Sequence, residues 1–404
     1  MPRAGWLVET GEVWEPWRLA DPGGVSVAAV AVFLRDLQAA GRSAATQRSY
    51  AMDLLRWLRF LWAVGVPWDQ ATRAEARDFS AWIAGAGKQE RPGQRGAGAG
   101  AAAGAVPGAA NVVTGKRAPG SKYAPATLAH SESVLRGFYE FHREAGTGPM
   151  VNPFPLARER RGGRAHAHRS PMEARRNEKA GLYRPPVARR VPRRIPDGKF
   201  NELFALLPSD RDRALAAFWV STGARASELL GATVADADAG QQLITVIRKG
   251  SGRMQQLPAS PDAFVWLRLY QARMQPLVPA GPDQPLWRTL RRPFRQLGYH
   301  AAYRMFSRAS AALGANWSLH DLRHTAAYRM ARDPLMPLTD VQWVLGHARL
   351  TTTQLYLTVP DEEVIASVLA HHSRRAAARD AVPEPPPARY RPESLRVLFG
   401  EGTA

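Results

Sequence analysis

Cysteine is absent from this sequence of 404 residues, and lysine occurs only six times. Without cysteine there is no disulfide, no thiolate nucleophile and no metal site with cysteine ligands, which favours an intracellular protein. No run of about 18 apolar residues occurs, so we expect no membrane-spanning helix. The first twenty residues carry tryptophans and acids in place of an apolar run, so we expect no secretory signal.

Motifs for a bound metal or nucleotide are also missing. His320 and His324 are four residues apart, but no third ligand stands near them at the spacing of a zinc site. The chain has no G-x-x-x-x-G-K-[ST] loop, which would hold the phosphates of a nucleotide. We therefore expect an activity that needs no cofactor and no metal.

Positive charge is abundant and unevenly distributed. The formal net charge is +20, with a pI near 11.0, and arginine outnumbers lysine 49 to six. Such a surplus favours a polyanionic partner, and nucleic acid is the commonest one inside cells. Residues 158–194 carry thirteen basic residues and three glutamates, half of the surplus, without helical or strand periodicity. This segment is interpreted as a linker that lies along DNA, with a solvated spacer as the alternative.

Helical periodicity dominates the chain before this linker. Ser43–Gly65 and Ala124–Gly146 each combine apolar residues at helical spacing with a terminal glycine. Residues 25–41 and 72–85 follow the same pattern, so a small all-helical domain is expected. The basic side chains available for phosphate contacts are Arg42, Arg48, Lys122 and Arg136, and each one taken alone is better explained as an ordinary surface charge.

The chain after the linker predicts a second, mostly helical domain. Within 241–258, a β-branched run, a polar K-G-S-G turn and a second run predict a β-hairpin. The expected fold class is therefore mainly α with a small β-hairpin or sheet. The expected organisation is an N-terminal extension (1–24), a helical domain (25–156) with a disordered Gly/Ala-rich loop (85–120), a basic linker (157–194), a second domain (195–375) and a Pro-rich tail (376–404).

Three short motifs of the second domain carry side chains suited to phosphate chemistry. In S-T-G-A-R-A-S-E-L-L-G, Arg225 stands at the start of a short helix, where its charge opposes the helix dipole unless it serves an anion. Lys249 lies at the hairpin tip and, unlike arginine, can release a proton. In S-L-H-D-L-R-H-T, His320 and Arg323 share one helix face. His324 is interpreted as a structural, hydrogen-bonded histidine.

The fourth motif is L-T-D-V-Q-W-V-L-G-H-A-R-L-T-T-T-Q-L-Y. Thr339 is expected to cap a short helix that ends at Gly346, and His347 follows at once. Thr351 is expected to cap a further helix that carries Tyr356. From this motif alone, Tyr356 is equally well explained as a packed aromatic and as a nucleophile.

Taken in order, A-R-A-S-E-L, the hairpin lysine, H-D-L-R-H-T and L-G-H with a tyrosine nine residues later resemble the tyrosine recombinase (phage integrase) family. The surroundings look most like integrases of actinobacterial mobile elements, and T-x-x-S-Y-x-x-D-L at 46–54 is similar to the family's core-binding domain. The resemblance covers roughly 25–160 and 195–372. It implies a two-domain, C-shaped DNA clamp, in which a helical core-binding (SAM-like) domain joins an α+β catalytic domain.

The resemblance also implies a reaction. A tyrosine would attack a DNA phosphate, form a 3′-phosphotyrosyl link and release a 5′-hydroxyl, and the covalent link would conserve the ester energy without a cofactor. The side chains implied are the nucleophile Tyr356, the phosphate clamps Arg225 and Arg323, the acid Lys249, the proton-transfer group His320, the phosphate donor His347 and the supporting Glu228.

The partner implied by the resemblance is double-stranded DNA at specific sites, in the integration or excision of a mobile element. The free protein would be a monomer and four protomers would act on two duplexes, in the bacterial cytoplasm at the nucleoid and away from any membrane. Two alternatives remain open: a type IB topoisomerase-like or resolvase enzyme, and a catalytically silent DNA-binding protein. Residues 361–372 would dock on a neighbouring protomer or pack on their own domain.

Overall fold

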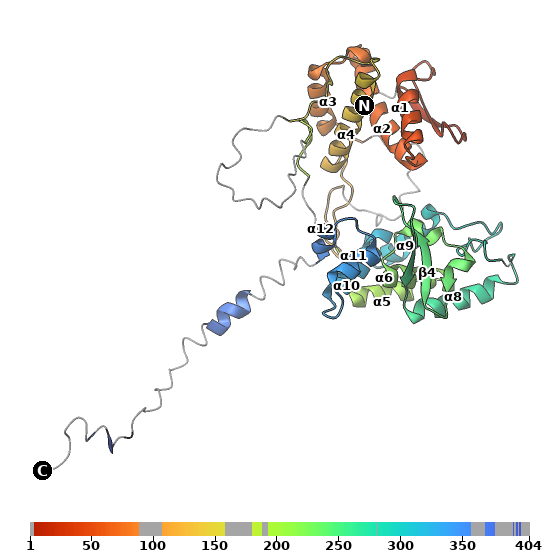
Figure 1. The fold of residues 1–404 in the computed structure, drawn as a ribbon, viewed down its shortest axis with the longest axis vertical. Helices are drawn as coiled ribbons and strands as arrows, with labels where there is room; N and C mark the ends of the chain where they lie inside the picture. The colour runs from red at the N-terminus through yellow and green to blue at the C-terminus, as the bar shows by residue number, and fades with distance from the viewer. Residues whose placement is uncertain are drawn as a thin grey trace. The chain divides into compact units, whose positions relative to one another are not determined.

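The computed structural model describes residues 4–88, 107–157, 180–187, 193–279, 281–356 and 368–375, with positions 391, 393, 394 and 396. The chain divides into two compact units (Figure 1). The first contains Met1–Arg190, Asp197–Pro208 and Leu297–Leu319, and the second contains Val191–Pro196, Ser209–Gln296 and His320–Ala404. The domain boundaries expected from the sequence stay predictions.

The first unit is mostly helical, as predicted. Its elements are β1 (Trp6–Glu9), β2 (Trp17–Ala20), α1 (Ala28–Ala39), α2 (Ala44–Val64), the 3-10 turn η1 (Trp68–Gln70), α3 (Arg73–Gly85), α4 (Pro125–Glu144), α5 (Asp197–Ala205) and α9 (Tyr299–Ala312). Ser43 begins α2 because its side chain accepts a hydrogen bond from the backbone N–H of Thr46. Gly65 ends α2 in the left-handed region, with φ 70°. The predicted helix from Ser43 to Gly65 is thus confirmed.

The core of this unit forms where α2 and α4 lie side by side (Figure 1). Trp57 of α2 is fully buried, and its Nε1 donates a hydrogen bond to Tyr139 Oη at 2.8 Å. The Tyr139 hydroxyl in turn donates to the carbonyl of Trp68 at 2.9 Å. This chain satisfies polar groups that would otherwise be costly inside an apolar core.

The N-terminal extension contains an antiparallel hairpin that the sequence analysis did not predict. Strands β1 and β2 pair from Trp6↔Ala20 to Glu9↔Trp17 and pack on α2. Trp17 Nε1 donates to the carbonyl of Ala44 at 2.9 Å, which fixes the hairpin at the start of α2.

Parts of the expected loop and linker are described. Residues 107–120 form a turn closed by the bridge Ala110↔Arg117, unlike the disordered loop expected over 85–120. The end of the linker packs on α4, where Arg184 Nη1 donates to Ser133 Oγ at 2.9 Å. The remaining parts of these predictions lie outside the described residues: 89–106 of the loop, 158–179 and 188–192 of the linker, 357–367 after Tyr356, and nearly all of the tail.

The second unit combines helices with a three-stranded antiparallel sheet of order β3-β4-β5. Its elements are α6 (Asp210–Thr222), α7 (Ala226–Leu230), η2 (Val234–Asp236), β3 (Ala237–Asp238), β4 (Leu243–Ile247), β5 (Met254–Pro258), α8 (Pro261–Met274), α10 (Leu319–Arg332), α11 (Leu338–Leu345), α12 (Leu350–Thr353) and η3 (Gln354–Tyr356). The predicted hairpin within 241–258 is confirmed, because β4 and β5 pair from Leu243↔Pro258 to Ile247↔Met254.

Two predicted helix caps are wrong. Helix α11 begins after Pro337, whose carbonyl accepts the first helical N–H groups, and Thr339 lies inside the helix. Helix α12 begins after Arg349, so Thr351 lies inside it as well. The chain tightens into the 3-10 turn η3 before it reaches Tyr356, instead of continuing one helix.

Replacement of Tyr139 by Phe tests the buried hydrogen-bond chain. The loss of the hydroxyl leaves Trp57 Nε1 without its acceptor inside the core, which costs about 1–3 kcal/mol of unfolding free energy. Urea unfolding followed by tryptophan fluorescence measures this loss. The control is Tyr50→Phe, since the Tyr50 hydroxyl has no hydrogen bond within the described residues; equal stability losses in both variants would contradict the prediction.

Candidate active site

A single buried carboxylate organises the candidate site. Glu228 is 4% exposed, and its Oε1 accepts from Arg225 Nη1 at 2.8 Å and from the Lys249 backbone N–H at 3.0 Å. Its Oε2 accepts from the Arg225 backbone N–H at 2.9 Å and from Arg248 Nη1 at 3.0 Å. Burial alone would raise the pKa of Glu228, but the bonds from Arg225 and Lys249 outweigh it and lower the pKa below its usual value. The carboxylate is therefore charged at neutral pH.

The sequence analysis missed an arginine that directly follows strand β4. Arg248 is 5% exposed, and it bonds to Gln255 Oε1 at 2.7 Å as well as to the Val344 carbonyl. The available signal was the strand period, because Ile244 and Val246 are buried and position 248 continues the same face. Gly346 has φ 61° and lies against this guanidinium, so a side chain there would be both strained and crowded.

Arg323 of α10 is the most deeply held of the predicted cations. It is 3% exposed, and it donates to the carbonyls of Gly223 and Leu345, each at 2.7 Å. Burial, followed by the nearby charge of Arg225, lowers the pKa of Arg323 to about 10, so it stays protonated at neutral pH. Gly223 ends α6 with φ 63°, and an added Cβ would come 2.8 Å from Leu345 Cδ2. Only glycine presents this carbonyl without strain.

His347 lies between Arg323 and the last helix of the site. Its Nε2 is 3.0 Å from Arg323 Nη2 and therefore accepts, which makes Nδ1 the donor to Thr353 Oγ1 at 3.0 Å. Burial and then the charge of Arg323 lower the pKa of His347 to about 4. The imidazole is therefore neutral at physiological pH, with its proton assigned to Nδ1 by these partners.

The surroundings of Tyr356 are compatible with both explanations that the sequence left open, a packed aromatic and a nucleophile. Tyr356 is 6% exposed and packs with Ala327, Val341 and Leu345, as a core aromatic would. Its hydroxyl nevertheless lies 2.9 Å from His324 Nδ1, and its ring stacks on His347 with a centroid distance of 6.3 Å and an angle of 8° between the planes.

Burial affects the acidity of this hydroxyl. It raises the pKa of Tyr356, and the charge of Arg323 only partly opposes the shift. The phenol is thus a weaker acid than a free tyrosine, and its ionisation needs a group that takes the proton.

The two histidines of α10 lie close to each other, and one of them contacts Tyr356. His324, interpreted as a structural histidine, is hydrogen-bonded as predicted, but its partner is the hydroxyl of Tyr356. His320 stands one turn earlier with an exposed side chain, and its ring centroid is 4.3 Å from that of His324. The backbone N–H of Lys249 donates to Glu228, while the Lys249 side chain is exposed.

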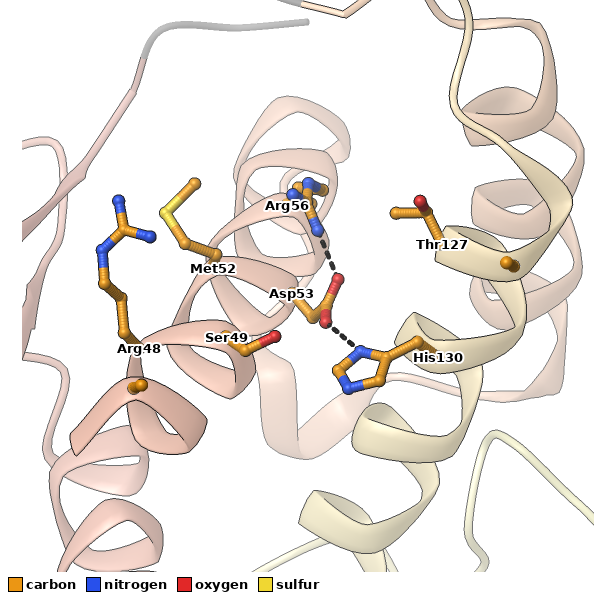
Figure 2. Close-up of a pocket in the computed structure, with 9 residues that line it drawn as sticks. Arg48, Ser49, Met52, Asp53, Arg56, Thr127 and His130 are labelled. Carbon is orange, nitrogen blue, oxygen red and sulfur yellow. Dashed lines mark hydrogen bonds and ion pairs between the residues drawn. The ribbon is translucent and has the colours of Figure 1, made fainter. Parts of the chain in front are cut away.

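A second polar cluster lines a pocket of about 420 Å³ between α2 and α4 (Figure 2). Asp53 is 2% exposed; it pairs with Arg56 and accepts from His130 Nδ1 at 2.8 Å. Burial raises the pKa of Asp53 although both partners oppose it. Arg48 stands on the pocket wall with its guanidinium 5.4 Å from the ring centre of Trp17.

The other predicted DNA contacts of this unit lie outside the pocket lining. Arg136 donates to Glu132 Oε1 at 2.8 Å, so it is tied to a buried acid. Lys122 is exposed next to the bridge that its backbone forms with Gly87. Arg42 is exposed before α2.

Neither a metal cluster nor a membrane span is found in the part of the chain that the structure describes. No three His, Asp or Glu side chains there stand close enough to hold a metal ion. No helix there is both long enough and apolar enough to cross a membrane.

The comparisons with known proteins agree on one family. Residues 199–363 match the phage integrase family, and residues 30–95 match the N-terminal SAM-like domain of phage integrases. The chain is 30% identical over 202 residues to the tyrosine recombinase XerD of Neisseria meningitidis, which covers 48% of this chain and 68% of that protein.

The chain belongs to the tyrosine recombinase (phage integrase) family. Its enzymatic class is that of a tyrosine site-specific recombinase. It is also 31% identical over 211 residues to the tyrosine recombinase XerC of Corynebacterium efficiens, over 49% of this chain and 64% of that protein.

Two solved structures share the fold of this tyrosine recombinase. The XerH site-specific recombinase bound to palindromic difH substrate gives a TM-score of 0.54 at 15% identity, over 84% of each chain. A lambda integrase dimer bound to a COC′ core site gives a TM-score of 0.52 at 15% identity, over 80% of this chain and 96% of that one. The mainly helical fold with small sheets is the fold of these recombinases.

Replacement of Glu228 by Gln tests the buried carboxylate through pH. At neutral pH the variant loses about 2–3 kcal/mol of unfolding free energy, because two guanidiniums lose their counter-charge. The pKa of Glu228 is lowered in the folded state from an ordinary value of 4.5. The wild-type advantage is therefore complete above about pH 4.5 and declines as the pH falls through the folded pKa.

Urea unfolding of both proteins between pH 3 and pH 7 measures this advantage. The control is Glu202→Gln, which removes an exposed carboxylate paired with Lys199 and should change little at any pH. An advantage of wild type that grows toward acid pH would contradict the role assigned to the Glu228 charge.

Proposed function

We propose that this tyrosine recombinase cuts and rejoins duplex DNA at specific sites through a 3′-phosphotyrosyl link to Tyr356. The observation that carries the proposal is the position of the Tyr356 ring against His347, which is hydrogen-bonded to Arg323, in a chain of this family. Its activity would serve the integration or excision of a mobile element in the bacterial cytoplasm. The solved XerH relative, described as a post-cleavage complex with its difH substrate, supports the reaction class.

The two arginines of the motifs would hold the scissile phosphate. Arg323 donates three of its five guanidinium N–H groups to Gly223, Leu345 and His347. The other two would donate to a phosphate. Arg225 is half-buried and fixed by Glu228 on one side. Both cations are thus oriented before substrate arrives, which is the arrangement that stabilises charge developing on a phosphate.

Lys249 and His347 would complete the phosphate site. The exposed Lys249 side chain rises from the hairpin tip and would protonate the leaving 5′-oxygen. His347 would donate to a phosphate oxygen only after its Nε2 gains a proton, because Nε2 accepts from Arg323 in the resting arrangement. The negative charge of an approaching phosphate favours that protonation by offsetting the charge of Arg323.

The pocket between α2 and α4 would be a DNA contact of the first unit. Arg48, Arg56 and His130 gather there with the hydroxyls of Ser49 and Thr127 (Figure 2). Guanidinium and hydroxyl groups are the side-chain groups that bind phosphate oxygens and base edges. Together with Arg136 and Lys122, they would form the contacts of this unit with duplex DNA.

Salt dependence tests this DNA contact. Arg48→Ala and Arg56→Ala should each weaken duplex binding. Each should also reduce the magnitude of the slope of log K against log salt by about one for every phosphate that the variant no longer neutralises. Gel-shift titrations at several salt concentrations measure the slope. Arg77→Ala is the control, because Arg77 is exposed on α3 and paired with Asp78; equal slopes for all three variants would remove α2 from the interface.

A nicked suicide duplex tests the covalent chemistry. Wild type should form a protein–DNA adduct that survives denaturing electrophoresis, and Tyr356→Phe should form none, because only the hydroxyl can attack. Tyr303→Phe is the matched control, since Tyr303 is exposed on α9. An adduct of undiminished yield in Tyr356→Phe would remove this tyrosine from the reaction.

Two intact duplexes then separate recombination from topoisomerase activity. A recombinase should assemble four protomers and exchange strands into a Holliday junction, whereas a topoisomerase-like enzyme would only relax supercoils. Crosslinking and native electrophoresis of the complex count the protomers. Relaxation without any junction would favour the topoisomerase alternative.

A further inference from the structure

The hydroxyl of Tyr356 is held by a histidine with no assigned role in the reaction. His324 Nδ1 lies 2.9 Å from Tyr356 Oη, and the two ring centroids are 5.7 Å apart. Tyr356 as a whole is 6% exposed, so bulk water has little access to this hydroxyl. A side chain in contact with the hydroxyl is therefore better placed than bulk water to take its proton.

The other basic groups near this hydroxyl are poorly placed for that step. The His347 ring lies parallel to the tyrosine ring, and its Nδ1 is bonded to Thr353 and its Nε2 to Arg323. Arg323 is protonated and cannot accept a proton. His320, to which the family resemblance assigns proton transfer, stands one turn away along α10 with an exposed side chain.

We propose that His324 is the general base that accepts the proton of Tyr356 as its oxygen attacks the scissile phosphate. This inference rests on the proposed function. When Nδ1 carries no proton, the hydroxyl donates to it across this 2.9 Å contact, so the proton acceptor already lies beside the nucleophile. His320, whose ring centroid lies 4.3 Å from that of His324, then acts on Tyr356 through this base.

The step balances in protons and bonds. The Oη–P bond forms while the P–O5′ bond breaks, the Oη proton moves to His324 Nδ1, and the leaving 5′-oxygen takes a proton from Lys249. Rejoining runs in reverse: the incoming 5′-hydroxyl gives its proton to Lys249, and His324 returns a proton to the released tyrosine. His324 thus acts as base in cleavage and as acid in rejoining, with no external reactant.

A substrate with sulfur in place of the bridging 5′-oxygen tests the assignment. A thiolate leaves without a proton, so it rescues the loss of the acid and not the loss of the base. Single-turnover cleavage by His324→Asn, whose amide keeps a polar atom near Nδ1 but no base, should fall by about 10²–10³-fold on both substrates. Lys249→Ala should fail on the oxygen substrate and recover on the sulfur substrate.

Two results would overturn the assignment. One is His324→Asn cleaving the oxygen substrate within about threefold of wild type, and the other is its recovery on the sulfur substrate like Lys249→Ala. Thermal unfolding and gel shifts check that His324→Asn folds and binds duplex. If it does not fold, His324→Gly with added imidazole replaces it, and its cleavage rate should rise with imidazole concentration. A cleavage rate that is independent of imidazole concentration would contradict the assignment.

The wild-type adduct separates this inference from the proposed function. If wild type forms no adduct with any suicide duplex, the recombinase chemistry itself fails and this inference fails with it. If wild type forms the adduct and Tyr356→Phe does not, the recombinase chemistry holds, and the behaviour of His324→Asn alone decides the role of His324.

Discussion

The buried negative charge of Glu228 is the interaction on which the candidate site depends. It joins the start of α7, the end of β4 and the hairpin turn, because its two oxygens accept from Arg225, Arg248 and the backbone of Lys249. Two guanidiniums this close would repel one another without the carboxylate. Arg225 and the hairpin that carries Lys249 are therefore held in place by one acid.

Arg323 holds the other part of the site together. Its guanidinium binds the carbonyls at the ends of α6 and α11, which fixes these helix ends around one point. His347 accepts from the same guanidinium and stacks on Tyr356, so Arg323, the proposed phosphate ligand, helps to position the proposed nucleophile. Packing and chemistry thus use the same residues, which explains why Tyr356 looks like an ordinary core aromatic.

Much of this was predictable from the sequence, since local signals determine local structure. The cap at Ser43, the glycines at 65 and 346 and the turn between β4 and β5 have clear signatures, and they appear where expected. The bond between His324 and Tyr356 joins residues 32 positions apart, and no spacing rule encodes it. The caps at Thr339 and Thr351 failed because Pro337 and Arg349 supply the first helical acceptors without a side-chain cap.

The central claim, that Tyr356 becomes linked to DNA, is tested most directly by mass spectrometry of the trapped adduct. Trypsin releases residues 350–374 as one peptide, and this peptide contains a single tyrosine. After nuclease digestion, that peptide should carry a nucleotide joined through its 3′-phosphate to the tyrosine. A nucleotide on any other peptide, or a 5′-linked nucleotide on this one, would contradict the account.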